Sequence, residues 1–277
     1  MIISTSISPA AITKFQTTVW NFYRAHRRTM PWRIEPTPYY VVVSELMLQQ
    51  TQVVRVQSKF VGFIRRFPTI EALAGAPLAD VLGAWSGLGY NRRAKFLWQT
   101  AQAVVQDYGG QVPRTQQDLV SLPGIGQNTA GAILAYAYNE PAVFIETNIR
   151  TVFIHHFFND HPGVVSDAEL HALVALALPI ENPREWYWAL MDYGTELKST
   201  VGSQLERAKH YRPQSIFKGS RRQVRGQVIK LLVEQRSMPV DEIKLLIPDL
   251  RLQEVCDELV AEGMIAHRGD ELHLTDS

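Results

Sequence analysis

Cysteine is nearly absent from this chain of 277 residues, which contains only Cys256. A single thiol cannot close an internal disulfide bond or build a cysteine-rich zinc site or a four-cysteine iron–sulfur cluster. The sequence also lacks an apolar run of the roughly 20 residues that cross a bilayer. Its N-terminus has no basic segment followed by an apolar core, so we expect a cytoplasmic protein without a signal peptide. The 46% hydrophobic and 20% charged fractions are typical of a packed chain of one or two domains.

An excess of either charge sign is also missing, because 28 basic side chains oppose 27 acidic ones. The balance is uneven along the chain, however. Residues 198–230 have nine basic side chains and one acidic one, whereas residues 231–277 have four basic and eleven acidic. A basic segment of this kind neutralises phosphates, which favours a nucleic-acid partner. Alternatively it folds back on the acidic tail, and the two interpretations are compatible.

Helical periodicity dominates the first 200 residues, which predicts a mainly α fold. Tyr39 to Phe67 is a long apolar-periodic stretch that ends at Pro68, and Thr69 is expected to cap the helix that follows. Further helices are predicted over 15–23, from Pro77, and over 92–108, 115–122, 128–138, 147–158, 166–178 and 183–197.

A different pattern begins at residue 220. It predicts helices over 221–235, 240–247 and 252–262, followed by a β-hairpin over 265–275 that turns at Gly269-Asp270. Three helices and a hairpin suggest a small winged-helix-like unit over 220–277. The third helix is acidic, whereas a helix that reads a DNA groove is basic. We therefore favour a docking role with a protein partner; the acidic residues are Glu254, Asp257, Glu258 and Glu262.

Three short segments have the residue types that chemistry on a nucleic acid needs. The first is Leu122-Pro123-Gly124-Ile125-Gly126, followed by a helix from about Asn128. Glycines before a helix N-terminus leave backbone N–H groups free to meet a phosphate. The pattern is that of a helix-hairpin-helix, which grips a phosphate backbone without reading bases. An ordinary corner between two helices is the alternative.

The second segment runs from Ser44 to Val53 and places Glu45 among valines, leucine and methionine. Burial disfavours the ionised carboxyl and raises its pKa, which suits a general acid. Alternatively Glu45 lies at the polar edge of its helix. The amide-rich run after it can bind base edges or only water; it comprises Gln49, Gln50, Thr51 and Gln52.

The third segment has Glu146 at the end of an apolar run and at the start of a helix. There it can simply pair with the helix dipole. Together with Glu45, it would complete the two-carboxylate arrangement that cleaves glycosidic bonds, with one group as acid and the other stabilising an oxocarbenium ion.

At these residues the chain resembles the MutY-like adenine DNA glycosylases of the helix-hairpin-helix base-excision superfamily, over roughly residues 10–200. The matching motifs are Pro31-Trp32-Arg33, Ser44 to Val53, Gly87-Leu88-Gly89-Tyr90, Leu122 to Gly126 and Thr129 to Ile133. The resemblance implies a two-lobed glycosylase domain over 1–200, with a six-helix lobe at about 36–143 and a second lobe from 10–35 plus 144–200. A basic linker over 201–219 would then join it to the C-terminal unit.

The resemblance also implies residue roles. Glu45 corresponds to the acid that protonates a flipped adenine, and Glu146 to the carboxylate that stabilises the sugar cation. Base-pocket residues would be Trp32, Arg33, Leu48, Asn128 and Trp188. DNA contacts would come from Gln49, Gln50, Thr51, Leu88, Tyr90, Gly124, Gly126, Lys198, Lys209, Arg221 and Arg222, with Gln50 and Tyr90 entering the duplex. The hairpin of relatives also holds a monovalent cation through backbone carbonyls.

The chain departs from the family in four places, and at a fifth position, Asn128, it differs from endonuclease III. Glu146 precedes Thr147-Asn148, where relatives have Asp-Gly-Asn, and Trp188 replaces a glutamine that contacts adenine. Asn128 stands where endonuclease III has its Schiff-base lysine, so we expect a monofunctional enzyme. No cysteine lies in residues 195–211, where the family has its iron–sulfur ligands, so we predict that the 4Fe–4S cluster is absent. The C-terminal domain that recognises 8-oxoguanine is replaced by the smaller acidic unit.

We therefore predict a monomeric DNA glycosylase that removes adenine opposite guanine or 8-oxoguanine from double-stranded DNA. A thymine or uracil mismatch glycosylase, a non-catalytic lesion binder and a transcription regulator are the alternatives. We further expect the basic residues to replace the cluster in DNA contact, so that charge reversal at Lys198, Lys209, Arg221 and Arg222 weakens binding and flattens its salt dependence. No metal site is expected at His155, His156 and His161, because adjacent side chains point to different helix faces.

Overall fold

The structure is a computed structural model that describes residues 7–159, 163–202, 205–209 and 216–275. The mainly α fold predicted from the sequence is confirmed. The chain divides into two compact units, the first made of residues 1–41, 114–120 and 125–213 and the second of residues 42–113, 121–124 and 214–277. Helices α3 (Pro38–Leu48) and α8 (Gln116–Ser121) each run from one unit into the other.

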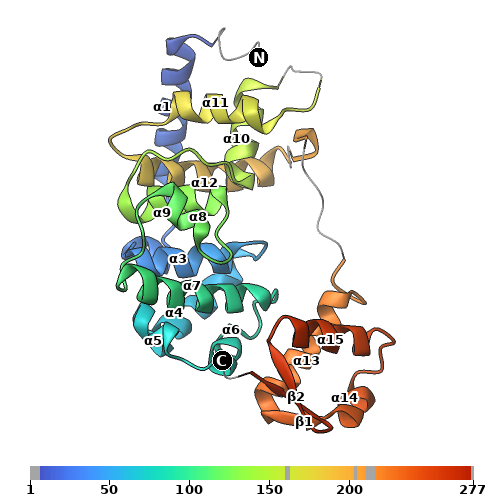
Figure 1. The fold of residues 1–277 in the computed structure, drawn as a ribbon. Coiled ribbons are helices and arrows are strands. Elements are labelled where there is room, and N and C mark those ends of the chain that lie inside the picture. Colours follow the sequence, from blue (N-terminus) through green and yellow to red (C-terminus); the bar gives the residue numbers. More distant parts are fainter. Residues whose placement is uncertain (1–6, 160–162, 203–204, 210–215, 276–277) are drawn as a thin grey trace. The chain divides into compact units, whose positions relative to one another are not determined.

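The first unit is built around α10 and α12, which pack side by side (Figure 1). Phe15 of α1 fills the space beside them, with its ring centroid 5.1 Å from Phe153 and 5.8 Å from Trp186. Aromatic side chains of this size dominate the energy of a core. The helices of this unit are α1 (Pro9–His26), α2 (Pro31–Ile34), α9 (Gln127–Tyr138), α10 (Thr147–Phe157), α11 (Asp167–Ala177), α12 (Pro183–Thr200) and the 3-10 helix η1 (Leu205–Arg207).

The second unit has a core that includes Phe63, Leu73, Leu82 and Trp85, all at most 1% exposed. Its first helices are α4 (Val53–Arg66), α5 (Ile70–Ala74), α6 (Leu78–Trp85) and α7 (Arg92–Tyr108). The C-terminal part adds α13 (Arg221–Gln235), α14 (Val240–Leu246) and α15 (Leu252–Ala261) with strands β1 (Ser237–Pro239), β2 (Ile265–Arg268) and β3 (Glu271–Leu274), which gather as a small module (Figure 1). The strands form an antiparallel sheet in the order β1-β3-β2.

Local sequence signals explain many helix ends. The hydroxyls of Ser8, Thr69, Ser166 and Ser220 each accept a hydrogen bond from the first turn of a helix, and Ser166 with Glu169 forms a capping box. Helix α7 ends at Gly109, which adopts a left-handed conformation with φ of 58°.

Two features of the structure go beyond what the sequence pattern predicts. The apolar stretch 39–67 is not continuous, because it breaks between α3 and α4, where Gln50 has a φ of 53°. The sheet contains a third strand, β1, which pairs Met238 with Leu272 and which the sequence pattern does not indicate. Among the described residues, no helix is both long and apolar enough to cross a membrane.

Candidate active site

Glu45 lies in the C-terminal half of α3, in the second unit. Glu45 is only 8% exposed, and its neighbours in the chain, Leu46 and Met47, are 1% and 0% exposed. The alternative in which Glu45 sits on a solvated helix edge is therefore wrong. Glu45 has the only carboxyl side chain in α3, and the helix contains no basic residue. Such a position is costly for a structural carboxylate and typical of a functional one.

Arg93 of α7 anchors the chain after Glu45. It is 7% exposed, and its guanidinium donates to the backbone oxygens of Leu46 and Met47 at 2.7 and 2.9 Å. It also donates to Thr51 Oγ1 at 2.9 Å and to the Gly89 oxygen at 3.2 Å. Burial lowers the pKa of Arg93 to about 10, so it stays charged at neutral pH. One buried cation thus fixes both loops to which we assign DNA contacts, 49–51 and 88–90. Sequence reasoning missed it.

The residues of these two loops differ in exposure. Gln50 is exposed with φ of 53°, and Tyr90 is partly exposed with φ of 49°. Non-glycine residues in this region are uncommon and cluster at functional sites. Arg222 donates to the Tyr90 hydroxyl, and its guanidinium lies 4.9 Å from the centre of the Tyr90 ring. Leu88 is 2% exposed, so its side chain packs in the core and is not presented on the surface.

The hairpin 122–126 has the backbone that its glycines predict. Gly124 has a φ of 76°, and a Cβ there would lie 2.7 Å from Phe96 Cβ, so glycine is required. Its oxygen accepts from Gln49 Nε2 at 3.5 Å, and the Pro123 oxygen accepts from Thr100 at 2.7 Å. Gly126 is the N-cap of α9. The amide groups of the first turn of that helix suit a phosphate. The monovalent cation stays a prediction.

Glu146 occupies the N-cap position of α10, in the first unit, but its side chain makes no capping hydrogen bond. Capping is therefore not its role. The residue is half-buried. Burial raises the pKa of Glu146, and the positive charge of Lys198 opposes that rise.

Two asparagines flank Glu146. Asn128, at the start of α9, accepts a hydrogen bond from the Ile145 amide at 3.2 Å through its side-chain oxygen, so it positions the segment that leads to Glu146. Asn148 accepts a hydrogen bond from Lys198 Nζ at 2.6 Å. The two asparagines thus fix the chain before Glu146 and tie the residue two positions after it to Lys198.

A polar cluster in the first unit connects the predicted pocket residues. Asp192 is 2% exposed, and its carboxylate accepts from Arg28 Nε at 2.8 Å and from Arg33 Nη1 at 2.9 Å. The Arg33 guanidinium also lies 5.5 Å from the centre of the Trp188 ring. Trp188 is partly exposed, whereas Trp186 is fully buried in the core. Sequence reasoning missed Arg28 and Asp192, although an acid in the apolar face of α12 was a signal.

Trp32, at the N-terminus of α2, is 8% exposed. Leu48, the last residue of α3, is partly exposed. The second unit therefore groups Glu45 with Leu48, the glutamine loop, Tyr90 and Gly124, whereas the first groups Glu146 with its two asparagines, Arg33 and Trp188.

Much of the basic segment pairs inside the protein. Arg221 forms ion pairs with Glu254 and Glu258, and Arg225 with Glu258 and Glu262. The interpretation in which the basic segment folds on the acidic tail is thus realised for these side chains. Lys198 contacts Asn148, whereas Lys209 is exposed. The predicted linker 201–219 contains residues 203–204 and 210–215, which lie outside the described residues.

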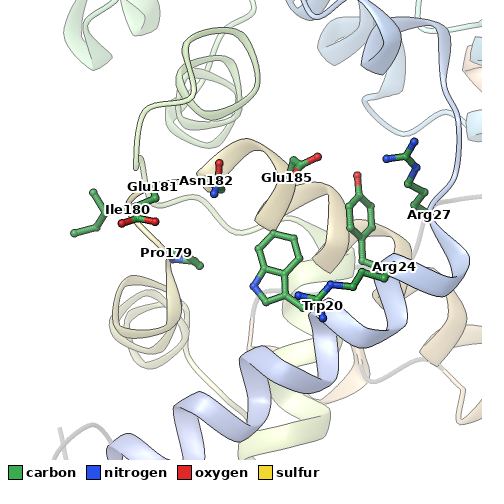
Figure 2. Close-up of a pocket in the computed structure, with 9 residues that line it drawn as sticks. Trp20, Arg24, Arg27, Pro179, Ile180, Glu181, Asn182 and Glu185 are labelled. Carbon is green, nitrogen blue, oxygen red and sulfur yellow. The ribbon is translucent and has the colours of Figure 1, made fainter.

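The first unit also contains an open cavity of about 830 Å³. Figure 2 shows Trp20 on its wall, Arg24 on α1 with Arg27 directly after that helix, and also Glu181 and Glu185, which line the cavity as well. Neither Glu146 nor Trp188 lines this cavity, so it is distinct from the predicted catalytic residues.

The described residues offer few side chains that could bind a metal ion or an iron–sulfur cluster. Among the described residues no group of three or more histidine, cysteine and acidic side chains is arranged to hold a metal ion. His156 contacts the Tyr193 hydroxyl at 3.0 Å, and His161 lies outside the described residues. The single cysteine, Cys256, is buried in α15, so the four thiolates of an iron–sulfur cluster do not fit this chain.

The helical arrangement, the glycine hairpin and the buried carboxylates define a base-excision repair fold. Residues 43–172 match the family described as HhH-GPD superfamily base excision DNA repair protein. An adenine DNA glycosylase of Mycolicibacterium smegmatis is 31% identical over 291 aligned residues, which span 96% of this chain and 94% of that protein. The chain belongs to the adenine DNA glycosylase family.

Two further similarities agree. An adenine DNA glycosylase of Buchnera aphidicola is 37% identical over 181 residues, which are 65% of this chain and 52% of that protein, so the chain matches about half the length of this relative. Among solved structures, a thermostable thymine-DNA glycosylase has a TM-score of 0.62 at 24% identity and covers 72% of this chain and 93% of its own. This last similarity concerns the fold.

Proposed function

We propose that the protein is a monofunctional DNA N-glycosylase that removes mispaired adenine, opposite guanine or 8-oxoguanine. One observation carries the proposal. In a chain that belongs to this family, Glu45 is buried in an apolar helix, and Glu146 stands at a helix N-terminus without making a capping hydrogen bond. A buried acid and a second carboxyl that makes no capping hydrogen bond are the two groups that this reaction needs.

The two carboxyls have different tasks in this mechanism. Glu45 protonates the flipped adenine, so that the base leaves as a neutral molecule. Glu146 then stabilises the positive charge that develops on the sugar, and water completes the hydrolysis. Because Asn128 stands where a Schiff-base lysine would be, and its side chain is engaged with Ile145, the reaction ends at the abasic site.

DNA contact on the phosphate backbone falls to the hairpin around Gly124 and Gly126 and to exposed basic residues such as Lys209. Gln50 and Tyr90 enter the duplex from loops that Arg93 holds. The reaction needs no iron–sulfur cluster. The acids Glu254, Glu258 and Glu262 of the third helix of the C-terminal module pair with arginines of the same unit, so the docking role expected for this helix is not part of the proposal. Because the substrate is chromosomal DNA, we expect the protein to act in the cytoplasm at the nucleoid.

Single-turnover assays on duplexes with A:8-oxoguanine, A:G, T:G or U:G pairs test the proposal. Wild-type protein should release adenine, and Glu45→Gln should slow release by about 10² or more while binding is kept. Glu234→Gln, an exposed acid on α13, is the matched control and should leave the rate unchanged. Failure to release any base would favour a lesion binder, and release that survives Glu45→Gln would overturn the mechanism.

A further inference from the structure

Lys198 lies in the last turn of α12, and its ammonium group reaches α10. Its Nζ donates to Asn148 Oδ1 at 2.6 Å, and Asn148 is two residues beyond Glu146. The side chain is partly buried, and Lys198 and Glu146 interact electrostatically. A lysine seldom gives up solvent unless a partner holds it.

The backbone of α12 brings this lysine to its place. A Cβ on Gly194 would lie 2.6 Å from the backbone oxygen of Asn148, so α10 and α12 meet here at a distance that only glycine permits. Lys198 is four residues further along α12 and therefore on the same helix face. The close contact at Gly194 thus aims Lys198 at the N-terminus of α10.

Other charged groups on the elements that pack against α10 are engaged elsewhere. On α11, Asp167 pairs with Arg150. On α12, Asp192 binds Arg28 and Arg33, and Glu196 is exposed. Arg207 of η1 donates to the Phe158 oxygen, and Tyr193 contacts His156. Among the described residues, Lys198 is the charged group with an interaction on Glu146.

The pair is mutually dependent. Burial raises the pKa of Glu146 and lowers the pKa of Lys198, whereas each charge favours the ionised form of the other. A carboxylate stabilises a sugar cation only when it is ionised. Without a nearby cation, burial would leave Glu146 protonated over a wider range of pH.

We propose that Lys198 is a positioning residue for the second carboxylate: its ammonium group fixes Asn148 and places a positive charge at the N-terminus of α10, where Glu146 stands. The proposal rests on the proposed function, because it assigns a role within that reaction. It also gives Lys198 a task other than the phosphate contact suggested by its place in a basic segment.

The test is the pH dependence of single-turnover adenine release between pH 5 and 9. Lys198→Met should move the acidic limb of the pH–rate profile to higher pH by about one unit or more. Its rate should approach that of the wild type in alkaline solution. Lys198→Arg should keep the limb in place. Lys198→Gln is neutral but still able to donate to Asn148, and should shift the limb as Lys198→Met does.

Lys14→Met, an exposed lysine on α1, is the control and should change neither rate nor limb. Thermal unfolding of each variant shows that it is folded. An equal loss of rate at every pH would indicate a merely structural role and overturn the inference, as would an unshifted limb in both neutral variants. A wild-type protein that releases no base from any duplex would refute the proposed function, and the inference with it.

Discussion

Gly194 offers a sharp test of how α10 and α12 hold the second carboxylate. Replacing it by alanine adds one methyl group, which would lie 2.6 Å from the Asn148 oxygen, 2.8 Å from its Cβ and 2.9 Å from its carbonyl carbon. Side-chain Cβ atoms essentially never approach other atoms closer than 3.0 Å. Two of these atoms are backbone, so no rotamer change relieves the contact, and the helices must separate.

Two opposing effects set the size of the change. Alanine is favoured over glycine inside a helix by about 0.8–1.0 kcal/mol. Forcing an extra methyl group into a packed core costs about 1–3 kcal/mol. The clash involves three atoms of a residue in a helix, so we place the cost at the upper end. Gly194→Ala should therefore lower the free energy of unfolding by about 1–2 kcal/mol, and each kcal/mol corresponds to about 2–4 °C in Tm.

Urea unfolding and single-turnover cleavage check this result. A shift of Asn148 and Glu146 by about 1 Å should also slow adenine release by about 10². Gly62→Ala is the matched control, because Gly62 is exposed in α4 and a Cβ there meets nothing within 4 Å. That variant should gain up to about 1 kcal/mol. If Gly194→Ala were as stable as Gly62→Ala, the close contact between the helices would not exist.

Three further predictions concern other parts of the chain. Arg93→Met should lose about 2–4 kcal/mol in urea unfolding, since it leaves the Leu46 and Met47 oxygens without their donor; an unchanged midpoint would contradict this. Burial lowers the pKa of His156 from 6.5 to about 4. The unfolded chain therefore binds an extra proton between these values, and stability should fall as pH drops through that window, by about 1–2 kcal/mol because solvent screens a partly exposed ring. His156→Gln should flatten this dependence, and an unaltered slope would refute the assignment. Glu262→Gln should destabilise the second unit by about 1–2 kcal/mol, because Arg92 loses its anionic partner and Arg225 loses one of its two; Glu271→Gln, on the hairpin, serves as control.

Local signals allowed several helices to be predicted to the residue. Helices α7 and α13 begin and end as expected, because Gly109 and Ser220 mark their ends in the sequence. The break inside 39–67 falls at the polar run Gln49 to Gln52, which marks its place in the sequence but not the conformation of its residues. That break depends on Arg93, which holds the Leu46 and Met47 oxygens from more than 40 residues away.

The same limit applies to the candidate site. Glu45 and Glu146 could be selected from their apolar surroundings and place in the chain, whereas Lys198 could be recognised only as part of a basic segment. Its contact with Asn148 joins residues 50 apart in the sequence. Charge counts also could not show which acids pair with Arg221 and Arg225. Their spacing of four residues matches that of Glu254, Glu258 and Glu262, and this was a usable signal for two helices joined by ion pairs.

The two carboxyls owe their different tasks to their surroundings. Glu45 is the sole charged residue of α3 and is only 8% exposed. Glu146 is also withdrawn from water, but Lys198 acts on it. If environment assigns the roles, removing the cation should impair the second carboxyl alone. The acidic limb of the pH profile would then move while the alkaline limb, which reports the acid, stays where it is.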